Sequence, residues 1–128
     1  MIVDTSALVA IVVQEPGSDE LIGKLAHTTR AGVGTPTLAE LGLVLAARLR
    51  TDPQLLIRQL LDQFAIVEIP FGPDHWREAV EAFLRYGRGR HPARLNFGDC
   101  LTYAVARLAN EPVLYVGDDF TATDLESA

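Results

Sequence analysis

Five carboxylates in this chain stand where charged side chains are uncommon. Three of them follow apolar runs that are typical of buried strands, and two lie within apolar segments that are typical of helices. They are Asp4, Glu40, Asp99, Asp118 and Asp119. Carboxylates are seldom left unpaired in apolar surroundings, because removing their charge from water costs several kcal/mol. Their placement therefore indicates a shared site.

Each acid also has an ordinary explanation when it is taken alone. Asp99 could complement a helix dipole in a first helical turn, and Asp4 could form a turn or cap a helix. Glu40 could face solvent, and the pair Asp118–Asp119 could form a turn. These explanations weaken together, because acids that converge repel one another and a bound cation relieves that repulsion.

The residue types favour Mg²⁺ as that cation, with Mn²⁺ as a substitute, because such hard cations prefer oxygen ligands. The histidines His27, His75 and His91 lack the spacing of a zinc site. Mg²⁺ held by few carboxylates keeps several waters and accepts phosphate oxygens, which suits hydrolysis of a phosphodiester bond by an activated water. Either one metal ion or two could support this hydrolysis. A thiol mechanism is not expected, because Cys100 has no evident basic partner.

Alternating strand and helix patterns surround these acids. The patterns predict strands at 1–3, 31–34, 66–69 and 113–116, and helices near 5–13, 18–26, 35–49, 53–64, 75–86 and 97–108. This order predicts an α/β fold with a mostly parallel, four- to five-stranded sheet and helices on both faces. Because ligands of such sheets bind at the carboxyl ends of the strands, Asp4 and the pair Asp118–Asp119 should share one edge.

Local signals give further expectations for the helices. The capping residues expected are Thr5 or Ser6 for the first helix, Ser18 for the second and Thr35 for the third. Segment 75–86 is expected to turn an apolar face inward, formed by Trp76, Ala79, Val80 and Phe83.

Length and composition predict one domain over residues 1–128. The single cysteine excludes an internal disulfide and favours the cytoplasm, since disulfides belong to oxidising compartments. No apolar run approaches the roughly 20 residues that a membrane-spanning helix needs. We therefore expect a cytoplasmic protein with no membrane partner.

The net charge of −6 argues against a general nucleic-acid binder, because such domains usually carry excess Lys and Arg. Basic residues are nevertheless dense in one short segment, which contains Arg85, Arg88, Arg90, His91 and Arg94. An acidic, cation-binding centre beside this segment would explain the charge balance and still allow phosphate binding. A solvated loop explains the segment equally well.

Four motifs resemble the PIN domain, and most closely the VapC toxins of type II toxin–antitoxin systems. They are Met-Ile-Val-Asp-Thr-Ser-Ala-Leu-Val-Ala at 1–10, Leu-Ala-Glu-Leu at 38–41, Leu-Asn-Phe-Gly-Asp-Cys at 95–100 and Val-Gly-Asp-Asp-Phe-Thr-Ala-Thr-Asp at 116–124. The loop Tyr-Gly-Arg-Gly-Arg-His-Pro-Ala-Arg-Leu-Asn at 86–96 is similar to that of one VapC subgroup. The resemblance covers nearly the whole chain in the right order.

This resemblance implies an Mg²⁺-dependent endoribonuclease. Asp4 and Asp99 match the family's principal metal ligands, and Glu40 matches its third acid. The fourth acid is either Asp118 or Asp119. A polar pair, Thr5 and Ser6, matches residues that hydrogen-bond the site.

The resemblance also implies partners. Family members usually form homodimers, and a cognate VapB-type antitoxin blocks the acidic cleft, often with a basic side chain. The substrate is RNA, and the basic residues between Arg85 and Arg94 are candidates for contacts to its backbone.

Two other functions stay open at this point. One is a metal-dependent nuclease acting on another nucleic acid, which would need a longer clamp to hold a duplex. The other is a catalytically silent interaction module that uses the same acids to bind a metal. A receiver-like module is disfavoured, because the only lysine, Lys24, precedes the late strands.

Overall fold

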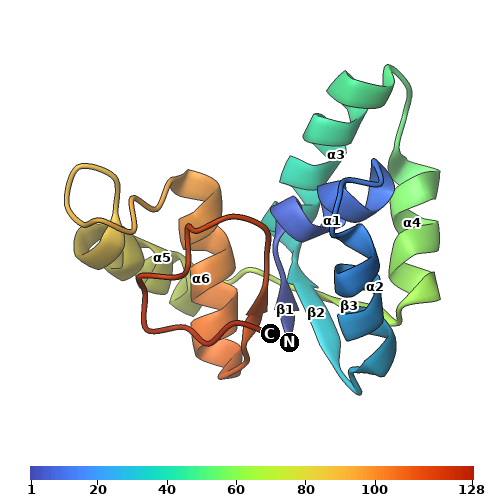
Figure 1. Cartoon of the computed structure of the whole chain (residues 1–128). Coiled ribbons are helices and arrows are strands. Elements are labelled where there is room, and N and C mark those ends of the chain that lie inside the picture. The colour runs from blue at the N-terminus through green and yellow to red at the C-terminus, as the bar shows by residue number, and fades with distance from the viewer.

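A four-stranded parallel sheet forms the centre of the molecule (Figure 1). In the computed structural model, which describes residues 1–128, the strands follow the order β3-β2-β1-β4. Their bounds are β1 Ile2–Val3, β2 Ala31–Gly34, β3 Ile66–Ile69 and β4 Val113–Leu114. Ile2 pairs with Gly32 on one side and with Val113 on the other. The parallel sheet predicted from the sequence is confirmed, although β4 is shorter than expected.

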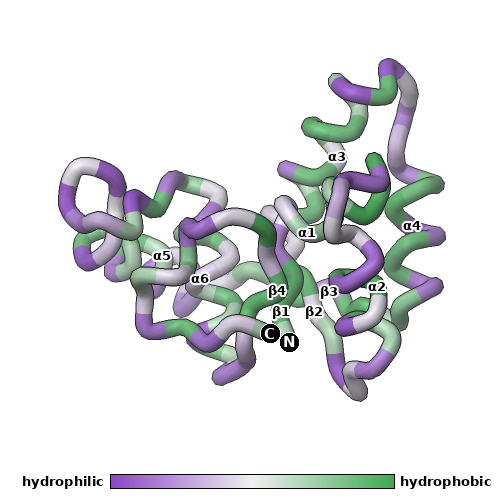
Figure 2. Tube along the Cα trace, viewed as in Figure 1, coloured by the Kyte–Doolittle hydropathy of each residue, from purple (hydrophilic) through white to green (hydrophobic).

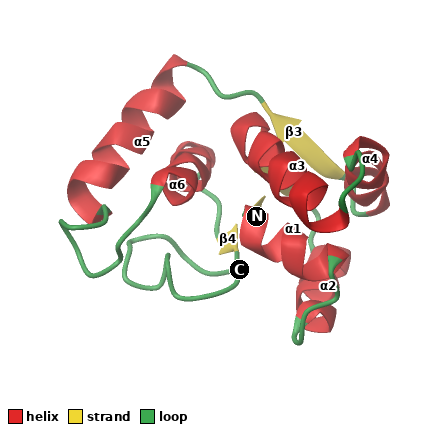
Figure 3. Cartoon of the chain, turned by 90° about the horizontal axis from the view of Figure 1, so that it is seen from above, coloured by secondary structure: helices red, strands yellow, loops and turns green.

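Six helices surround the sheet: α1 Thr5–Val12, α2 Ser18–His27, α3 Thr35–Leu49, α4 Gln54–Gln63, α5 Pro73–Tyr86 and α6 Phe97–Ala109. Helices α5 and α6 lie on one side of the sheet, and α1, α2 and α4 lie on the other (Figures 1 and 3). This arrangement confirms the predicted α/β class. None of the helices combines the length and the apolar character that crossing a membrane requires.

Two hydrophobic cores occupy the two faces of the sheet. Neighbouring strand residues point to opposite faces, so Ile2 joins the core under α5 and α6 while Val3 joins the core formed with α1 to α4. Val113 and Leu114 divide between the cores in the same way. In Figure 2, hydrophobic residues, drawn in green, accordingly gather at the central strands of the sheet. Glycine in β2 lets α6 approach closely, because a Cβ at Gly34 would lie 2.9 Å from a methyl group of Val105.

The helix caps differ from those expected. The N-cap of α1 is Asp4, whose Oδ2 accepts a hydrogen bond from the Ser6 amide at 3.0 Å. The expectation of Thr5 or Ser6 was wrong, because the carboxylate reaches the free amide two residues ahead. Helices α2 and α3 begin after Gly17 and Gly34, with no side-chain cap, so Ser18 and Thr35 are first helical residues instead.

The inward face predicted for α5 was wrong for three of its four residues. Ala79 is buried, but Trp76, Val80 and Phe83 are 54%, 49% and 39% exposed. Helix α5 instead buries Ala79, Ala82 and Tyr86. Small residues on this edge allow close packing against α6, which leaves the larger apolar side chains at the surface.

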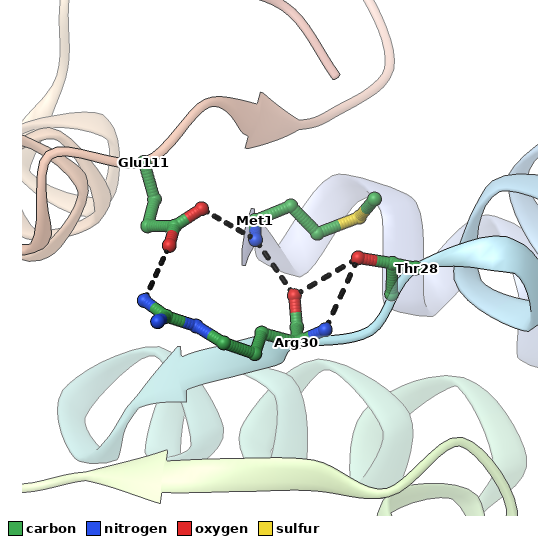
Figure 4. Close-up of polar contacts among 4 residues, drawn as sticks. All are labelled: Met1, Thr28, Arg30 and Glu111. Atoms are coloured by element: carbon green, nitrogen blue, oxygen red, sulfur yellow. Dashed lines mark hydrogen bonds and ion pairs between the residues drawn. The ribbon is translucent and has the colours of Figure 1, made fainter.

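The amino-terminal edge of the sheet is held by an ion-pair network (Figure 4). The amine of Met1 donates to Glu111 Oε2 at 3.0 Å and to the Arg30 carbonyl at 2.8 Å. The guanidinium of Arg30 donates to Glu111 Oε1 at 2.6 Å. The hydrogen bond from the amine is the largest of the effects that lower the pKa of Glu111. The network joins β1, β2 and the approach to β4, and leaves the carboxyl ends of the strands free for a site.

Candidate active site

Asp4 lies directly after β1 and is held by three hydrogen bonds. Its Oδ2 accepts from the Ser6 hydroxyl at 2.6 Å and from the Ser6 amide, and its Oδ1 accepts from the Thr102 hydroxyl at 2.6 Å. The Ser6 Oγ also accepts from the Val116 amide at 3.0 Å, at the start of the loop that carries Asp118 and Asp119. Asp4 is 6% exposed. Its carboxylate is therefore fixed in place by α1 and α6 together.

Asp99 lies in the first turn of α6 and forms a reciprocal cap with Asn96. Asp99 Oδ2 accepts from the Asn96 amide, and Asn96 Oδ1 accepts from the Asp99 amide, both at 2.9 Å. This pairing is a capping box with Asn and Asp in place of the usual Ser and Glu. It orients a carboxylate that is only 7% exposed. The other oxygen, Asp99 Oδ1, accepts no hydrogen bond from any residue.

Several effects raise the pKa of Asp99 to about 6. Burial is the largest of them, and the negative charges of Asp119, Asp4 and Glu40 follow in that order. The amide of Asn96 acts in the opposite direction. Acids from four distant parts of the sequence therefore influence one another. The loops after β1 and β4 supply two of them, and the helices α3 and α6 supply Glu40 and Asp99.

Glu40 reaches this group from α3. The Thr5 hydroxyl donates to Glu40 Oε1, so the two helices that follow β1 and β2 are tied together at the site. The carboxylate rests against Gly98, where a Cβ would lie 3.1 Å from Glu40 Cδ and even closer to Oε2. Any other residue at position 98 would displace the carboxylate.

The loop after β4 carries the two remaining candidates. Asp118 and Asp119 are both exposed, but only Asp119 is among the charges that raise the pKa of Asp99. The next residue, Phe120, is 2% exposed and packs on the ring of Tyr115 at a centroid distance of 5.1 Å. The difference in their effect on Asp99 favours Asp119 over Asp118 as the fourth acid of the site.

These side chains do not yet form a ready-made metal site. No group of three or more His, Cys, Asp or Glu side chains has a geometry that could hold a metal ion. The oxygen donor set nevertheless suits a hard cation. Burial is the main cause of the raised pKa of Asp99, and the negative charges of neighbouring acids add to it; a cation would offset that repulsion. The histidines are scattered, and Nδ1 of each ring forms a hydrogen bond with a nearby backbone group.

Cys100 is unsuited to nucleophilic chemistry. Burial, with the neighbouring charge of Asp99, raises the pKa of its thiol to about 11. A thiolate is therefore scarce at neutral pH, and the thiol of this 4% exposed residue packs in the core under α6.

The pKa of Asp99 predicts a pH-dependent stability difference between the metal-free protein and its Asp99→Asn variant. Because the folded state binds this proton more tightly than the unfolded state, the carboxylate costs stability as the pH rises from its ordinary pKa of 3.8 to about 6. Above that range, the free energy of unfolding of Asp99→Asn should exceed that of the wild type by up to about 3 kcal/mol. Urea unfolding in EDTA at pH 4 and pH 7.5 measures the difference, and equal differences at both values would contradict this origin.

The structure divides the basic segment into engaged and free side chains. Arg85 forms an ion pair with Asp124 at 3.7 Å and lies over the ring of Tyr86. Arg90 lies over Phe83 at 5.5 Å, and His91 meets the edge of Tyr86. The remaining two, Arg88 and Arg94, are exposed and form no ion pair. Arg85 is therefore the weakest of the five candidates for RNA contact.

Sequence reasoning missed three residues of the site. Thr102, 1% exposed, donates to Asp4 across 98 positions of sequence, which no local pattern reveals. Asn96 is nearer to a recognisable signal, because a polar residue three positions before an acid is a known helix-start pattern. The role of Gly98 depends on its contact with Glu40, which lies 58 positions earlier in the sequence.

A buried tyrosine ties down the chain beyond the acidic loop. The Tyr103 hydroxyl donates to Asp124 Oδ1 at 2.7 Å, and Arg107 and Arg85 approach Asp124 Oδ2 at 3.9 and 3.7 Å. Although burial acts to raise the pKa of Asp124, the hydrogen bond and the two guanidinium groups keep it below its ordinary value. This cluster fixes the segment after Phe120 onto α5 and α6.

Removal of that hydroxyl should destabilise the fold. We expect Tyr103→Phe to lower the free energy of unfolding by about 1 to 2 kcal/mol, because a charged acceptor loses its donor. Tyr86→Phe is the matched control, since the Tyr86 ring is buried but its hydroxyl makes no hydrogen bond to another residue. Thermal unfolding of both variants measures the difference, and equal losses would show that ring packing alone matters.

Comparison with known proteins supports one family. The PIN domain family model matches residues 1–125. Ribonuclease VapC36 of Mycobacterium tuberculosis is 44% identical over 127 residues, which cover 98% of this chain and 91% of that protein. Ribonuclease VapC42 of the same species is 43% identical, with 100% and 98% covered. Ribonuclease VapC of Mycolicibacterium smegmatis is 34% identical, with 98% and 97% covered.

Solved structures share the fold at lower sequence identity. The Mycobacterium tuberculosis toxin VapC20, described as cleaving the sarcin–ricin loop, superposes with a TM-score of 0.76 at 17% identity, covering 99% of this chain and 97% of its own. A toxin–antitoxin complex from Klebsiella pneumoniae gives a TM-score of 0.72 at 17% identity, covering 96% and 92%. From the match over 125 residues and the close relatives, the chain belongs to the PIN domain family, among the VapC ribonucleases.

Proposed function

We propose that this protein is an Mg²⁺-dependent endoribonuclease and the toxin of a type II toxin–antitoxin system. One observation carries the proposal: Asp4, Glu40 and Asp119 gather around a buried Asp99 whose pKa they raise. Relatives that are 43% and 44% identical over nearly the whole chain are named VapC ribonucleases.

Asp99, Asp4, Glu40 and Asp119 are the side chains that would hold the cation. When bound, Mg²⁺ supplies activation of the attacking water and neutralises charge at the phosphate. Asp99 offers an oxygen free of protein donors, whereas both oxygens of Asp4 are oriented by Ser6 and Thr102. Thr5 holds Glu40 against Gly98. We propose that this framework presets the acids, because preorganised groups need little movement during the reaction.

We propose that the basic segment binds the RNA backbone through Arg88, Arg90 and Arg94, with His91 near them. Reversing two of these charges, in Arg88→Glu with Arg90→Glu, should weaken RNA binding and lower the slope of log affinity against log salt by about 1 to 2, since each lost phosphate contact contributes roughly 0.7 for single strands.

The matched control reverses two other exposed arginines, Arg50 and Arg58, which form no ion pair and lie at the end of α3 and on α4. Both double variants carry the same net charge. If their affinities and salt slopes are equal, only the overall charge matters, and the basic segment has no special role.

We also propose a VapB-type antitoxin, a homodimer and a cytoplasmic location. The acidic site would attract a basic inhibitory segment, and a structural neighbour is a toxin–antitoxin complex. The lone, buried Cys100 suits a reducing compartment. Size measurement of the purified chain, alone and with a co-expressed antitoxin, tests the first two points.

A cleavage assay on tRNA, rRNA and DNA, with Mg²⁺, Mn²⁺ or EDTA, tests the function. We expect RNA cleavage that needs a divalent ion and is lost in Asp4→Asn, and growth arrest when the wild type is expressed without an antitoxin. Preferred cleavage of DNA would support the other nuclease function. Metal binding without any cleavage would support a silent interaction module.

A further inference from the structure

Phe97 is the most exposed large hydrophobic side chain of the protein. It is 79% exposed, more than Leu43 at 75% or Leu55 at 70%. It takes no part in the aromatic or cation–π contacts of the structure. The fold itself therefore gains nothing from this ring, which leaves its apolar surface in water at a cost.

Phe97 is held at the rim of the acidic site. It is the first residue of α6, between the cap residue Asn96 and Gly98, against which the Glu40 carboxylate rests. The reciprocal hydrogen bonds of Asn96 and Asp99 span Phe97 and fix its backbone. The ring cannot turn into the core, because the inward face of α6 is filled by Cys100, Tyr103 and Ala104.

We propose that Phe97 is a stacking site for an unpaired nucleobase next to the phosphate that is cut. This inference rests on the proposed ribonuclease function and deepens it. Aromatic side chains recognise single-stranded RNA by stacking on splayed bases, while basic groups track the backbone. Exposed Arg94, three residues before Phe97, is placed to supply such a contact. Bases inside a duplex are already stacked, so this ring would take only an unpaired base.

RNA binding by Phe97→Leu tests the ring itself, because leucine keeps the apolar character and removes the π face. The measurement uses a labelled pool of random single-stranded RNA and a labelled RNA duplex, in an Asp4→Asn background that does not cut. We expect Phe97→Leu to bind the single-stranded pool about 5- to 150-fold more weakly, as the loss of one stacked base implies. Phe97→Trp should restore binding, and duplex affinity should not change.

Trp76→Ala is the matched control, since Trp76 is an exposed aromatic residue on α5 whose ring is already covered by Arg77 at 5.0 Å. Equal single-strand affinity for the wild-type residue and Phe97→Leu, with RNA cleavage intact, would overturn the stacking site and leave the proposed function standing. A change in oligomeric state instead of RNA affinity would identify the ring as a protein contact and overturn it too. Absence of RNA binding and cleavage in the wild type would reject the function and the stacking site together.

Discussion

Asp99→Asn is expected to reduce Mg²⁺-dependent RNA cleavage by about 1000-fold, the loss that follows when roughly 4 kcal/mol of transition-state stabilisation disappears. Asn keeps the shape of the side chain and can still accept from the Asn96 amide, so the capping box survives. The charge and its attraction for a cation are removed. One oxygen of Asp99 accepts no hydrogen bond, and the charges of three neighbouring acids act on this carboxylate, so we expect it to contribute strongly to holding a divalent ion.

Single-turnover cleavage at saturating Mg²⁺ measures this loss. The free energy of unfolding of Asp99→Asn supplies the control, because the metal-free variant should be at least as stable as the wild type at neutral pH. Stability and activity should therefore move in opposite directions, as is common where a site stores unfavourable charge. Cleavage at the wild-type rate by a well-folded Asp99→Asn protein would reject a mechanism based on this acid.

The sheet was predictable because its signals are local. Short apolar runs bounded by polar turns marked all four strands, and their parallel order placed the acids after β1 and β4 at one edge. The carboxylates were noticeable for the same reason, since a charge within an apolar run stands out in the sequence itself.

Contacts between distant residues were not predictable in this way. The Thr102 hydroxyl that binds Asp4 lies on an apolar helix, where its sequence neighbours say nothing about a partner 98 positions away. The pairing of Tyr103 with Asp124 depends on how the last segment folds back over α6. The burial of α5 was also hard to predict. Helical spacing identifies an apolar face, but the size of the side chains that face α6 decides which side of the helix is buried.

The choice between Asp118 and Asp119 shows where structure adds most. In the sequence, the two acids are adjacent and chemically identical, so the sequence left the choice between them open. In the structure, the two acids differ in their effect on Asp99. Asp119, and not Asp118, is among the charges that raise the pKa of Asp99, which favours Asp119 as the fourth acid.

Asp119→Asn should therefore reduce cleavage by about 10- to 100-fold, the usual cost of losing a group that supports a metal site, whereas Asp118→Asn should stay close to the wild-type rate. The two variants form a matched pair, because they remove the same charge from adjacent exposed positions of one loop. Measuring the Mg²⁺ concentration for half-maximal cleavage separates weaker cation binding from a slower chemical step. A larger loss in Asp118→Asn would reverse the assignment. Equal losses would mean that the loop contributes only its total charge, since position within it would then make no difference.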